Sequence, residues 1–394
     1  MRIGIDGGCL ANQRGFGRFA RQTLAALAEA NSPHRFVVFV DRPSVESVRV
    51  PDGFETVVVD VRDAPSRAAS AQGSRRVSDL LAMGRAVART PLDLMFFPAS
   101  YSFFPVWNCG RLVVTMHDTL ALAHPDLVFP TRRGRIAWTL KEYAAARWAD
   151  RILTVSQTAR RDLIAWFNLP ESRVDVVGEG PEAVFRPTPL GAESDAVLTR
   201  YGLSPKGRYW LYVGGLSPHK NLLRLIEAFS RTEADDLTLV LVGDLGDVFH
   251  THVPALRDAT KRWNVKDRVI FTGFVPDDEL ATLYSRAYAL VQPSLMEGFG
   301  LPPVESMACG TPVLYSRAGS LPEVVGAAGL DFDPTDVRAM TSILDRVASD
   351  LALRQRLAGL ALERAKEHTW AASAQALLAC FESLRPGRTR GAVA

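Results

Sequence analysis

The chain has 394 residues, of which 47% are hydrophobic and 23% are charged, as in globular proteins with buried cores. This composition excludes a disordered, collagen-like or disulfide-scaffold protein, and the length predicts about two or three domains. The formal net charge of +3 gives no argument for nucleic acid as a partner.

Four scattered cysteines without C-x-x-C spacing fit buried thiols in a reducing compartment. The N-terminus, MRIGIDGG, lacks the apolar segment of a secretory signal, and no apolar run is long enough to predict a membrane-spanning helix. We therefore expect a cytoplasmic protein, with peripheral membrane contact left open.

Apolar runs rich in Val and Ile alternate with helix-period segments through the first half of the chain. The sequence predicts helices at residues 17–30, 75–89 and 133–148, and strands at residues 2–6, 36–41, 56–61, 92–97, 112–116, 152–155 and 174–177. Strands that are apolar along their whole length and separated by helices indicate a parallel sheet covered on both faces.

The second half repeats this alternation. The predicted strands lie at residues 209–213, 237–242, 269–272, 289–292 and 312–315, and the predicted helices at residues 221–230, 253–263, 278–287, 301–309 and 337–347. Two prolines in FRPTPL mark a boundary, so we predict domains at residues 1–187 and 188–370. Residues 62–74 and 386–394 are predicted to be a mobile loop and a frayed tail.

The segment SLMEGFGLPPVESMACG, residues 294–310, carries most of the predicted chemistry. Gly298 and Gly300 form a turn after a strand, and two prolines then occupy the first turn of a helix. Backbone N–H groups at such a helix start bind anions such as a diphosphate. Glu297 before the turn and Glu305 inside the helix can accept hydrogen bonds from sugar and ribose hydroxyls. The alternative is that both acids only complement the helix dipole.

This segment resembles the E-x7-E signature of glycosyltransferase family 4, whose members are retaining nucleotide-sugar transferases with the GT-B fold. YVGGLSPHKNLLRLIEAF, VIFTGFVPDDELATLYSRA and GSLPEVVGAAGLDFDPTD resemble further blocks of that family, as do RGFGRF, VVTMHD and ILTVSQTARRDL in the first half. The resemblance covers residues 1–385. It implies an α/β protein of two facing Rossmann-like doubly wound domains with a cleft between them. It also implies a terminal helix at residues 371–386 that crosses back to the first domain.

Lys220 follows the Gly214–Gly215 turn at a predicted strand end, where its ammonium can neutralise a leaving diphosphate. The alternative is a solvated lysine in the first turn of a helix. Many relatives carry an arginine near this loop, whereas this chain has Gly215 and His219. Either a protonated His219 substitutes for that arginine, or the phosphates depend more on backbone amides.

His117 lies in VVTMHD at a predicted strand end, and the resemblance implies that it contacts the donor sugar near the reacting carbon. A lone histidine is otherwise an ordinary loop residue. Asp118 either positions His117 or caps the following turn.

Gly15 and Gly17 formally fit the dinucleotide-binding pattern G-x-G-x-x-[GA], with Asp41 as a candidate ribose ligand. The glycines come too far after the first predicted strand for that fingerprint. A loop that reaches the donor phosphates or the acceptor fits the spacing better than an NAD site.

Two further segments have open alternatives. Gly273 and Phe274 either border the nucleotide base or simply end a strand. The basic stretch at residues 131–151, which interleaves Arg with Trp and Tyr, is either core plus a solvated face or a membrane-interfacial surface for a lipid-linked acceptor.

We therefore predict a metal-independent, retaining hexosyltransferase. It would use a nucleotide diphosphate-sugar as co-substrate, with GDP-mannose first and then a UDP-sugar or dTDP-rhamnose, and it would need no other cofactor. The acceptor would be a saccharide or lipid-linked saccharide in surface polysaccharide synthesis. The alternatives are a transferase with a small-molecule acceptor, a nucleotide-sugar epimerase and an NAD-dependent oxidoreductase.

The predicted catalytic residues are His117, Lys220 and Glu297. The predicted donor-binding residues are Gly15, Gly17, Gly214, Gly215, His219, Lys220, Gly273, Phe274, Glu297, Gly298, Phe299, Gly300, Leu301 and Glu305.

Overall fold

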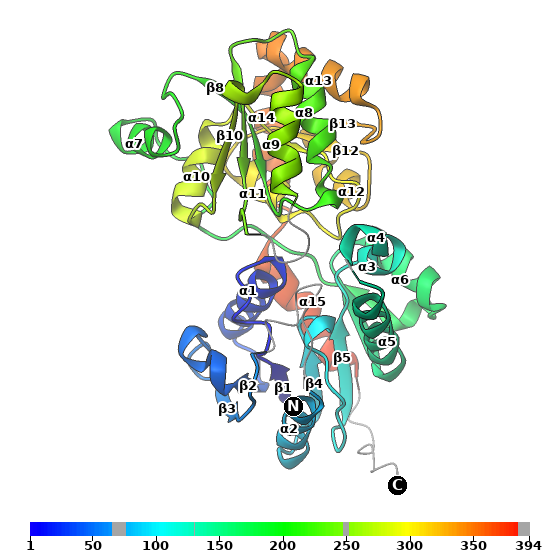
Figure 1. Cartoon of the computed structure of the whole chain (residues 1–394). Helices are drawn as coiled ribbons and strands as arrows, with labels where there is room; N and C mark the ends of the chain where they lie inside the picture. Colours follow the sequence, from blue (N-terminus) through cyan, green and yellow to red (C-terminus); the bar gives the residue numbers. More distant parts are fainter. Residues whose placement is uncertain (65–75, 130, 247–251, 385–394) are drawn as a thin grey trace. The chain divides into compact units, whose positions relative to one another are not determined.

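The computed structural model describes residues 1–64, 76–129, 131–246 and 252–384. The chain divides into two compact units (Figure 1). Unit 1 comprises Met1–Glu179 and Trp370–Ala394, and unit 2 comprises Gly180–Thr369. Most of the predicted mobile loop, from residue 65 onward, and the predicted tail at 386–394 lie outside the described residues.

Unit 1 contains a seven-stranded parallel sheet in the order β3-β2-β1-β4-β5-β6-β7. All seven strands predicted for the first half are confirmed to within two residues: β1 (Arg2–Asp6), β2 (Arg35–Asp41), β3 (Glu55–Val59), β4 (Leu94–Phe97), β5 (Arg111–Thr115), β6 (Arg151–Thr154) and β7 (Val174–Val176). The last four residues of β1 and all of β4 are buried, as a sheet covered on both faces requires.

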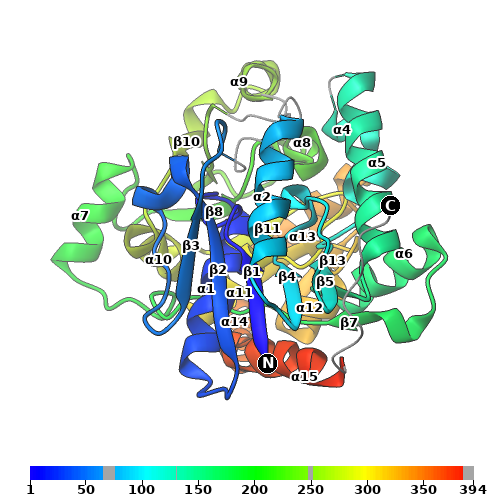
Figure 2. The same cartoon turned by 90° about the horizontal axis from the view of Figure 1, so that it is seen from below.

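Helices cover both faces of this sheet, with α1 and α15 on one side and α2 on the other (Figure 2). The apolar core on the α2 side also takes in alanines of α5 and a leucine of α6. The helices of unit 1 are α1 (Gly15–Glu29), α2 (Val77–Arg89), α3 (Leu120–Ala123), α4 (Pro125–Val128), α5 (Arg132–Trp148), α6 (Gln157–Phe167) and α15 (Trp370–Ser383). Helix α6 was not predicted from the sequence. Ser156 caps it by accepting a hydrogen bond from the Ala159 amide.

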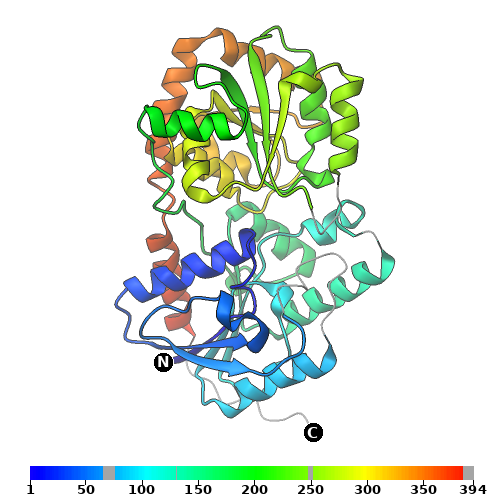
Figure 3. The ribbon, with the colours of Figure 1, turned by 60° about the vertical axis from the view of Figure 1, so that its left-hand side comes forward.

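Unit 2 has a six-stranded parallel sheet in the order β10-β9-β8-β11-β12-β13, with helices on both faces (Figure 3). Its strands are β8 (Arg208–Val213), β9 (Leu237–Val242), β10 (Val269–Gly273), β11 (Ala289–Gln292), β12 (Val313–Ser316) and β13 (Gly329–Phe332). Its helices are α7 (Ala192–Arg200), α8 (Leu222–Ser230), α9 (Val253–Arg262), α10 (Asp277–Arg286), α11 (Leu301–Ala308), α12 (Leu321–Val325), α13 (Val337–Ser349) and α14 (Leu351–Ala365). The strand β13 and the helices α7, α12 and α14 were not predicted as elements.

The division between the units falls at Glu179 and Gly180, eight residues before the predicted boundary at 187/188. The intervening segment packs on α10 of unit 2: the Phe185 ring lies edge-on to Tyr284, and the Thr188 amide donates to Ser285 Oγ. The proline-rich segment is therefore part of unit 2 rather than a free linker.

The terminal helix α15 is part of unit 1. Its Phe381 ring lies 5.5 Å from Phe96 of β4, and the Ser373 hydroxyl donates to the Gly178 carbonyl at 2.6 Å. All four cysteines are buried thiols that form no disulfide. None of the helices in the described part of the chain is both long and apolar enough to span a bilayer.

Candidate functional site

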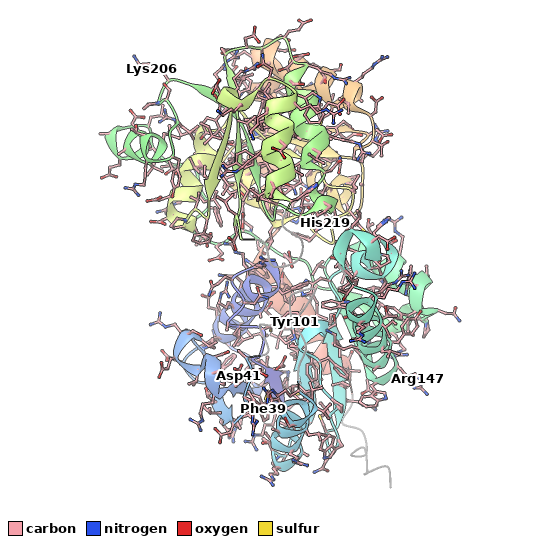
Figure 4. The ribbon with its side chains drawn as sticks, viewed as in Figure 1. Phe39, Asp41, Tyr101, Arg147, Lys206 and His219 are labelled. Carbon is pink, nitrogen blue, oxygen red and sulfur yellow. The ribbon has the colours of Figure 1, made fainter. Side chains whose placement is uncertain are left out.

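In unit 2, strand order reverses between β8 and β11, which are hydrogen-bonded neighbours. Ligands of doubly wound sheets bind at the carboxyl ends of the strands at such a reversal. The loop after β8 carries His219, labelled in Figure 4, and Lys220, and the loop after β11 carries Glu297. The two loops are joined by a hydrogen bond from the Leu295 amide to the His219 carbonyl at 2.8 Å.

Asn221 joins the loop after β8 to other strand ends through hydrogen bonds. Its side-chain amide donates to the carbonyls of Pro293, after β11, and Pro334, after β13, at 3.0 and 2.8 Å. Asn221 also adopts a left-handed backbone conformation with φ 60°, from which α8 starts. The loop that carries Lys220 is thus tied to two other strand ends.

Lys220 and Glu297, which the sequence analysis predicted separately, form a bidentate ion pair. Lys220 Nζ lies 2.7 Å from Glu297 Oε1 and 2.9 Å from Oε2, and the two side chains are only 17% and 12% exposed. Glu297 Oε1 also accepts hydrogen bonds from Gln292 Nε2 at 2.8 Å and from Ser294 Oγ at 2.7 Å. Gln292 and Ser294 were not predicted as site residues.

These neighbours keep the Glu297 carboxylate ionised. Burial acts to raise its pKa, but the charge and hydrogen bonds of Lys220, with the hydroxyl of Ser294, outweigh burial and lower the pKa below its usual value. A negative charge at Glu297 is therefore a stable feature of this end of unit 2.

Of the two alternatives for the absent arginine, the surroundings of His219 disfavour a protonated ring. Burial, reinforced by the positive charge of Lys220, lowers the pKa of His219 to about 3, although Glu297 acts in the opposite direction. The ring is neutral at physiological pH, and its Nδ1 lies 3.2 Å from Ser217 Oγ. Of the two sequence alternatives, this leaves Lys220 and the backbone amides to meet an anion.

Helix α11 begins directly after the glycine turn. Gly300 is its N-cap with φ 106° and Leu301 is its first residue. Pro302 and Pro303 follow and have no N–H group, so Leu301 is the only one of the first three helical residues with an amide donor. Glu305, on the second turn, is 1% exposed and accepts a hydrogen bond from the Tyr284 hydroxyl at 2.9 Å. Tyr284 belongs to α10 and was also missed by the sequence analysis.

The remaining predicted residues of unit 2 lie at other strand ends. Gly214 follows β8 with its amide bonded to the Val242 carbonyl, and the Gly215 carbonyl accepts from Tyr212. Gly273 ends β10, and the Phe274 side chain after it is 72% exposed. Phe299 is buried with its ring edge-on to His368. Gly298 lies in the turn between Glu297 and α11.

His117 follows β5 in unit 1 and is buried. Its Nε2 lies 3.1 Å from the Pro98 carbonyl oxygen and its Nδ1 lies 3.6 Å from Glu179 Oε1. The Phe16 and Phe19 rings of α1 pack edge-on against the imidazole, at centroid distances of 4.9 and 4.7 Å. The RGFGRF and MHD motifs therefore meet in space.

The neighbours of His117 also bear on the open alternatives. Asp118 Oδ1 accepts a hydrogen bond from the Leu120 amide, which is the capping role. Gly17 packs so closely on the Asn12 carbonyl that a Cβ would lie 1.7 Å from it, whereas a Cβ at Gly15 would meet open space. Residues 7–14 separate β1 from α1, so the glycines do not follow the strand directly as a dinucleotide fingerprint requires.

Among the described residues, no group of three or more His, Cys, Asp and Glu side chains is placed to hold a metal ion. A D-x-D triplet does occur, at Asp331-Phe332-Asp333. Asp331 forms an ion pair with Arg317, and Asp333 accepts hydrogen bonds from the amide and hydroxyl of Thr335.

Two family models match the chain in consecutive blocks. The model described as Glycosyltransferase Family 4 matches residues 14–181, and the model described as Glycosyl transferases group 1 matches residues 197–363. A curated relative, O-antigen chain mannosyltransferase B of Escherichia coli, is 35% identical over 275 residues, which are 68% of this chain and 69% of the relative. The chain belongs to glycosyltransferase family 4.

This glycosyltransferase aligns with different fractions of the length of other curated relatives. The D-inositol 3-phosphate glycosyltransferase of Acidothermus cellulolyticus is 32% identical over 293 residues, covering 71% of this chain and 63% of the relative. The serotype-specific mannosyltransferase WbdA of Escherichia coli is 29% identical over 278 residues. That match covers 70% of this chain but only 34% of WbdA.

Solved structures agree on the fold of this glycosyltransferase. Sucrose-phosphate synthase from Thermosynechococcus elongatus matches with a TM-score of 0.76 at 21% identity, covering 98% of this chain and 99% of that one. WaaG, a glycosyltransferase involved in lipopolysaccharide biosynthesis, matches with a TM-score of 0.72 at 15% identity, covering 98% and 100%. The fold is GT-B, as predicted.

Proposed function

We propose that this family 4 enzyme is a retaining hexosyltransferase that uses a nucleotide diphosphate-sugar, with GDP-mannose as the first candidate donor. The proposed acceptor is a saccharide, free or lipid-linked, in cell-surface polysaccharide synthesis. Three relatives named as O-antigen or serotype-specific mannosyltransferases support mannose and this acceptor class. A structural neighbour, HepE of Anabaena, was solved in complex with UDP-glucose, so a UDP-sugar is the second candidate.

The observation that carries this proposal is the Lys220–Glu297 pair beside the start of α11. A diphosphate at this point would meet the ammonium of Lys220 and backbone amides of the glycine turn and of Leu301 at the helix start, which stabilise negative charge. The carboxylates of Glu297 and Glu305 would accept hydrogen bonds from the sugar and the ribose, respectively. With this charge stabilisation the transfer would need no metal ion.

In the proposed reaction, the bond between the anomeric carbon and the β-phosphate oxygen breaks as positive charge develops on the sugar. The acceptor oxygen attacks from the same face, which retains the anomeric configuration, and its proton passes to the departing phosphate. Lys220 stabilises the developing negative charge on that phosphate. His117 is proposed to contact the donor sugar near the reacting carbon.

A thermal-shift screen against GDP, UDP, dTDP, ADP and NAD tests the donor site. A nucleoside diphosphate at about 100 times its Kd stabilises the protein by about 2.7 kcal/mol, which raises Tm. Lys220→Ala should abolish the shift, and both Lys220→Ala and Glu297→Gln should abolish transfer with the fold intact. A shift with NAD alone, or full transfer in both variants, would overturn the proposal.

We further propose that α5 lies against the anionic cytoplasmic face of a membrane when the acceptor is lipid-linked. Ile136 and Leu140 are 59% and 67% exposed, and Tyr143 lies on the same face at helical spacing. Exposed arginines flank them, including Arg147, labelled on the outer side of α5 in Figure 4. The only acid of α5, Glu142, is buried. Apolar and basic side chains on one exposed helix face suit an anionic bilayer surface.

Vesicle co-sedimentation tests this contact. The protein should bind phosphatidylcholine vesicles that contain phosphatidylglycerol, bind pure phosphatidylcholine less, and dissociate at high salt. The double variant Ile136→Glu/Leu140→Glu should lose binding, whereas Leu360→Glu, at an exposed leucine of α14, should not. Equal binding by both variants would contradict the proposal, and activity on a soluble acceptor is independent of either result.

A further inference from the structure

Lys220 has two roles that compete for one ammonium group. In the structure it bonds both oxygens of Glu297, and in the proposed reaction, on which this inference rests, it stabilises the diphosphate. Two of the three N–H donors of this ammonium bond Glu297, so a diphosphate that accepts more than one hydrogen bond from Lys220 draws it partly away from Glu297. What then holds the Glu297 carboxylate decides whether it can still bind the sugar.

The two oxygens of Glu297 are held differently. Oε1 accepts from Lys220, Gln292 and Ser294, whereas Oε2 accepts from Lys220 alone among the described residues. If Lys220 moves to the diphosphate, Oε1 keeps two donors and Oε2 becomes an open acceptor. That oxygen can then accept a hydrogen bond from a donor-sugar hydroxyl.

Gln292 is placed in a way that packing alone does not explain. It ends β11, is 1% exposed, and its amide Nε2 donates to both Glu297 Oε1 and Ser294 Oγ. Its Oε1, in contrast, is buried without a hydrogen-bond partner among the described residues. A buried amide oxygen without a partner is costly, so an apolar side chain would serve a purely structural purpose better.

We propose that Gln292 and Ser294 are positioning residues that hold Glu297 Oε1, so that Lys220 and a sugar hydroxyl exchange at Oε2 as the donor binds. Glu297 then responds to both ends of the donor. It loses hydrogen bonds from Lys220, which moves to the diphosphate, and it accepts a hydrogen bond from a sugar hydroxyl. The sugar-binding carboxylate keeps its position when its ion pair opens.

A positioning role for Gln292 and Ser294 differs from a general structural role in its effect on two dissociation constants: that of a nucleoside diphosphate and that of its sugar conjugate. The matched pairs are GDP with GDP-mannose and UDP with UDP-glucose, measured by calorimetry. Gln292→Met should leave the Kd of the nucleoside diphosphate within about twofold of wild type. It should weaken binding of the sugar conjugate, and lower kcat/KM, by about tenfold or more, because a hydrogen bond to a charged group is lost. Ser294→Ala should act in the same direction.

Glu297→Gln gives the sharper signature. Removing the negative charge frees Lys220, so this variant should bind the nucleoside diphosphate at least as tightly as wild type. It should lose the additional affinity that the sugar of the conjugate provides.

Gln292→Glu adds a pH test, since a carboxyl group can donate to Glu297 Oε1 only when it is protonated. Its binding of the sugar conjugate should recover as pH falls, with Lys220 and the neutral His219 as the other titratable neighbours of Glu297.

The control is Thr232→Val, which removes a buried hydroxyl at the opposite end of α8 from Lys220. Unchanged binding of the sugar conjugate in Gln292→Met would overturn the inference. Equal loss of diphosphate and sugar conjugate in that variant would also overturn it, because Gln292 would then shape the whole loop. A wild-type protein that binds neither pair would overturn the proposed function itself, and this inference with it.

Discussion

At the scale of residues, the site keeps one positive and one negative charge in a largely buried place. Lys220 and Glu297 neutralise each other, and neighbouring polar groups complete the hydrogen bonding of the carboxylate. The imidazole of His219 lies beside them but stays uncharged, because burial and, to a smaller extent, the positive charge of Lys220 lower its pKa. In the proposed reaction, the positive side-chain charge that meets the diphosphate therefore comes from Lys220.

The neutral state of His219 has a consequence for stability. Its folded-state pKa of about 3 lies below the usual value of 6.5, so the unfolded chain takes up a proton first as pH falls. The free energy of unfolding should therefore decrease below pH 6.5. His219→Asn should reduce the loss between pH 6.5 and 5 by on the order of 1 kcal/mol, somewhat less than the full linkage value because the ring is not completely buried.

Denaturant unfolding across this pH range measures the difference. His124→Asn, at an exposed histidine of unit 1, is the matched control. If wild type and His219→Asn lose stability in parallel, His219 is not held neutral by its surroundings.

Motifs identified the residues of the site whose chemistry is local, and missed those that depend on tertiary contacts. Glu297, Glu305 and Lys220 stand beside turns whose glycines and prolines are visible in the sequence. Gln292 ends an apolar strand and Tyr284 lies on a helix, where nothing in the sequence distinguishes them from core residues. Only the fold brings their polar atoms to Glu297 and Glu305.

At the scale of elements, the turn before α11 is supported by the loop before α12. The Ser320 amide and hydroxyl both donate to the Glu297 carbonyl, at 3.1 and 3.0 Å, and the same hydroxyl donates to the Phe299 carbonyl. Gly319 lies directly against Glu297, where a Cβ would come within 2.5 Å of its carbonyl oxygen. The position of Glu297 therefore depends on a second loop as well as on its own strand.

Gly319→Ala should displace Glu297. Alanine adds strain at φ +58° and a clash with the Glu297 backbone, so we expect transfer to fall at least about tenfold and the free energy of unfolding to fall by more than about 1 kcal/mol. Gly326→Ala is the matched control, since it has φ +55° but nothing within 4 Å of its Cβ. Steady-state kinetics and thermal unfolding compare the two variants, and equal kinetics would remove Gly319 from the support of Glu297.

Strand prediction succeeded where the sequence has a continuous apolar run. The inner strands of both sheets are such runs, and each was predicted to within two residues. The edge strands β3 and β10 were also predicted, although they are largely not buried, because they include VVV and VIF. The edge strand β13, GLDF, was missed because Asp331 separates its two apolar residues. Helix α14 was missed because its polar residues are spread around the helix, which leaves only a weak apolar stripe at Leu353, Leu357 and Ala361.

At the scale of the whole molecule, each unit has its own apolar core. One core joins β-strands of unit 1 to α2, α5 and α6, and the other joins strands of unit 2 to α8, α9 and α13. Helix α15 belongs to unit 1 although it follows the whole of unit 2 in the chain. The sequence pattern predicted two domains, but the assignment of this last helix came from the family resemblance, because an amphipathic helix does not indicate which sheet it covers.

Two separate cores predict that core substitutions act on one unit at a time. Phe381→Ala removes a fully buried ring of α15 that packs on Phe96, on the face of the unit 1 sheet opposite the α2 core, and should cost about 3–5 kcal/mol in that unit. Leu256→Ala removes a fully buried side chain of α9 and should cost about 2–5 kcal/mol in unit 2. Calorimetry with and without the nucleoside diphosphate that binds should assign each thermal unfolding transition to a unit.

The ligand should raise the temperature of only the transition whose temperature Leu256→Ala lowers. Phe381→Ala should keep the wild-type affinity for the ligand. A single transition that both variants lower equally, and that the ligand raises in both, would show that the two cores unfold together.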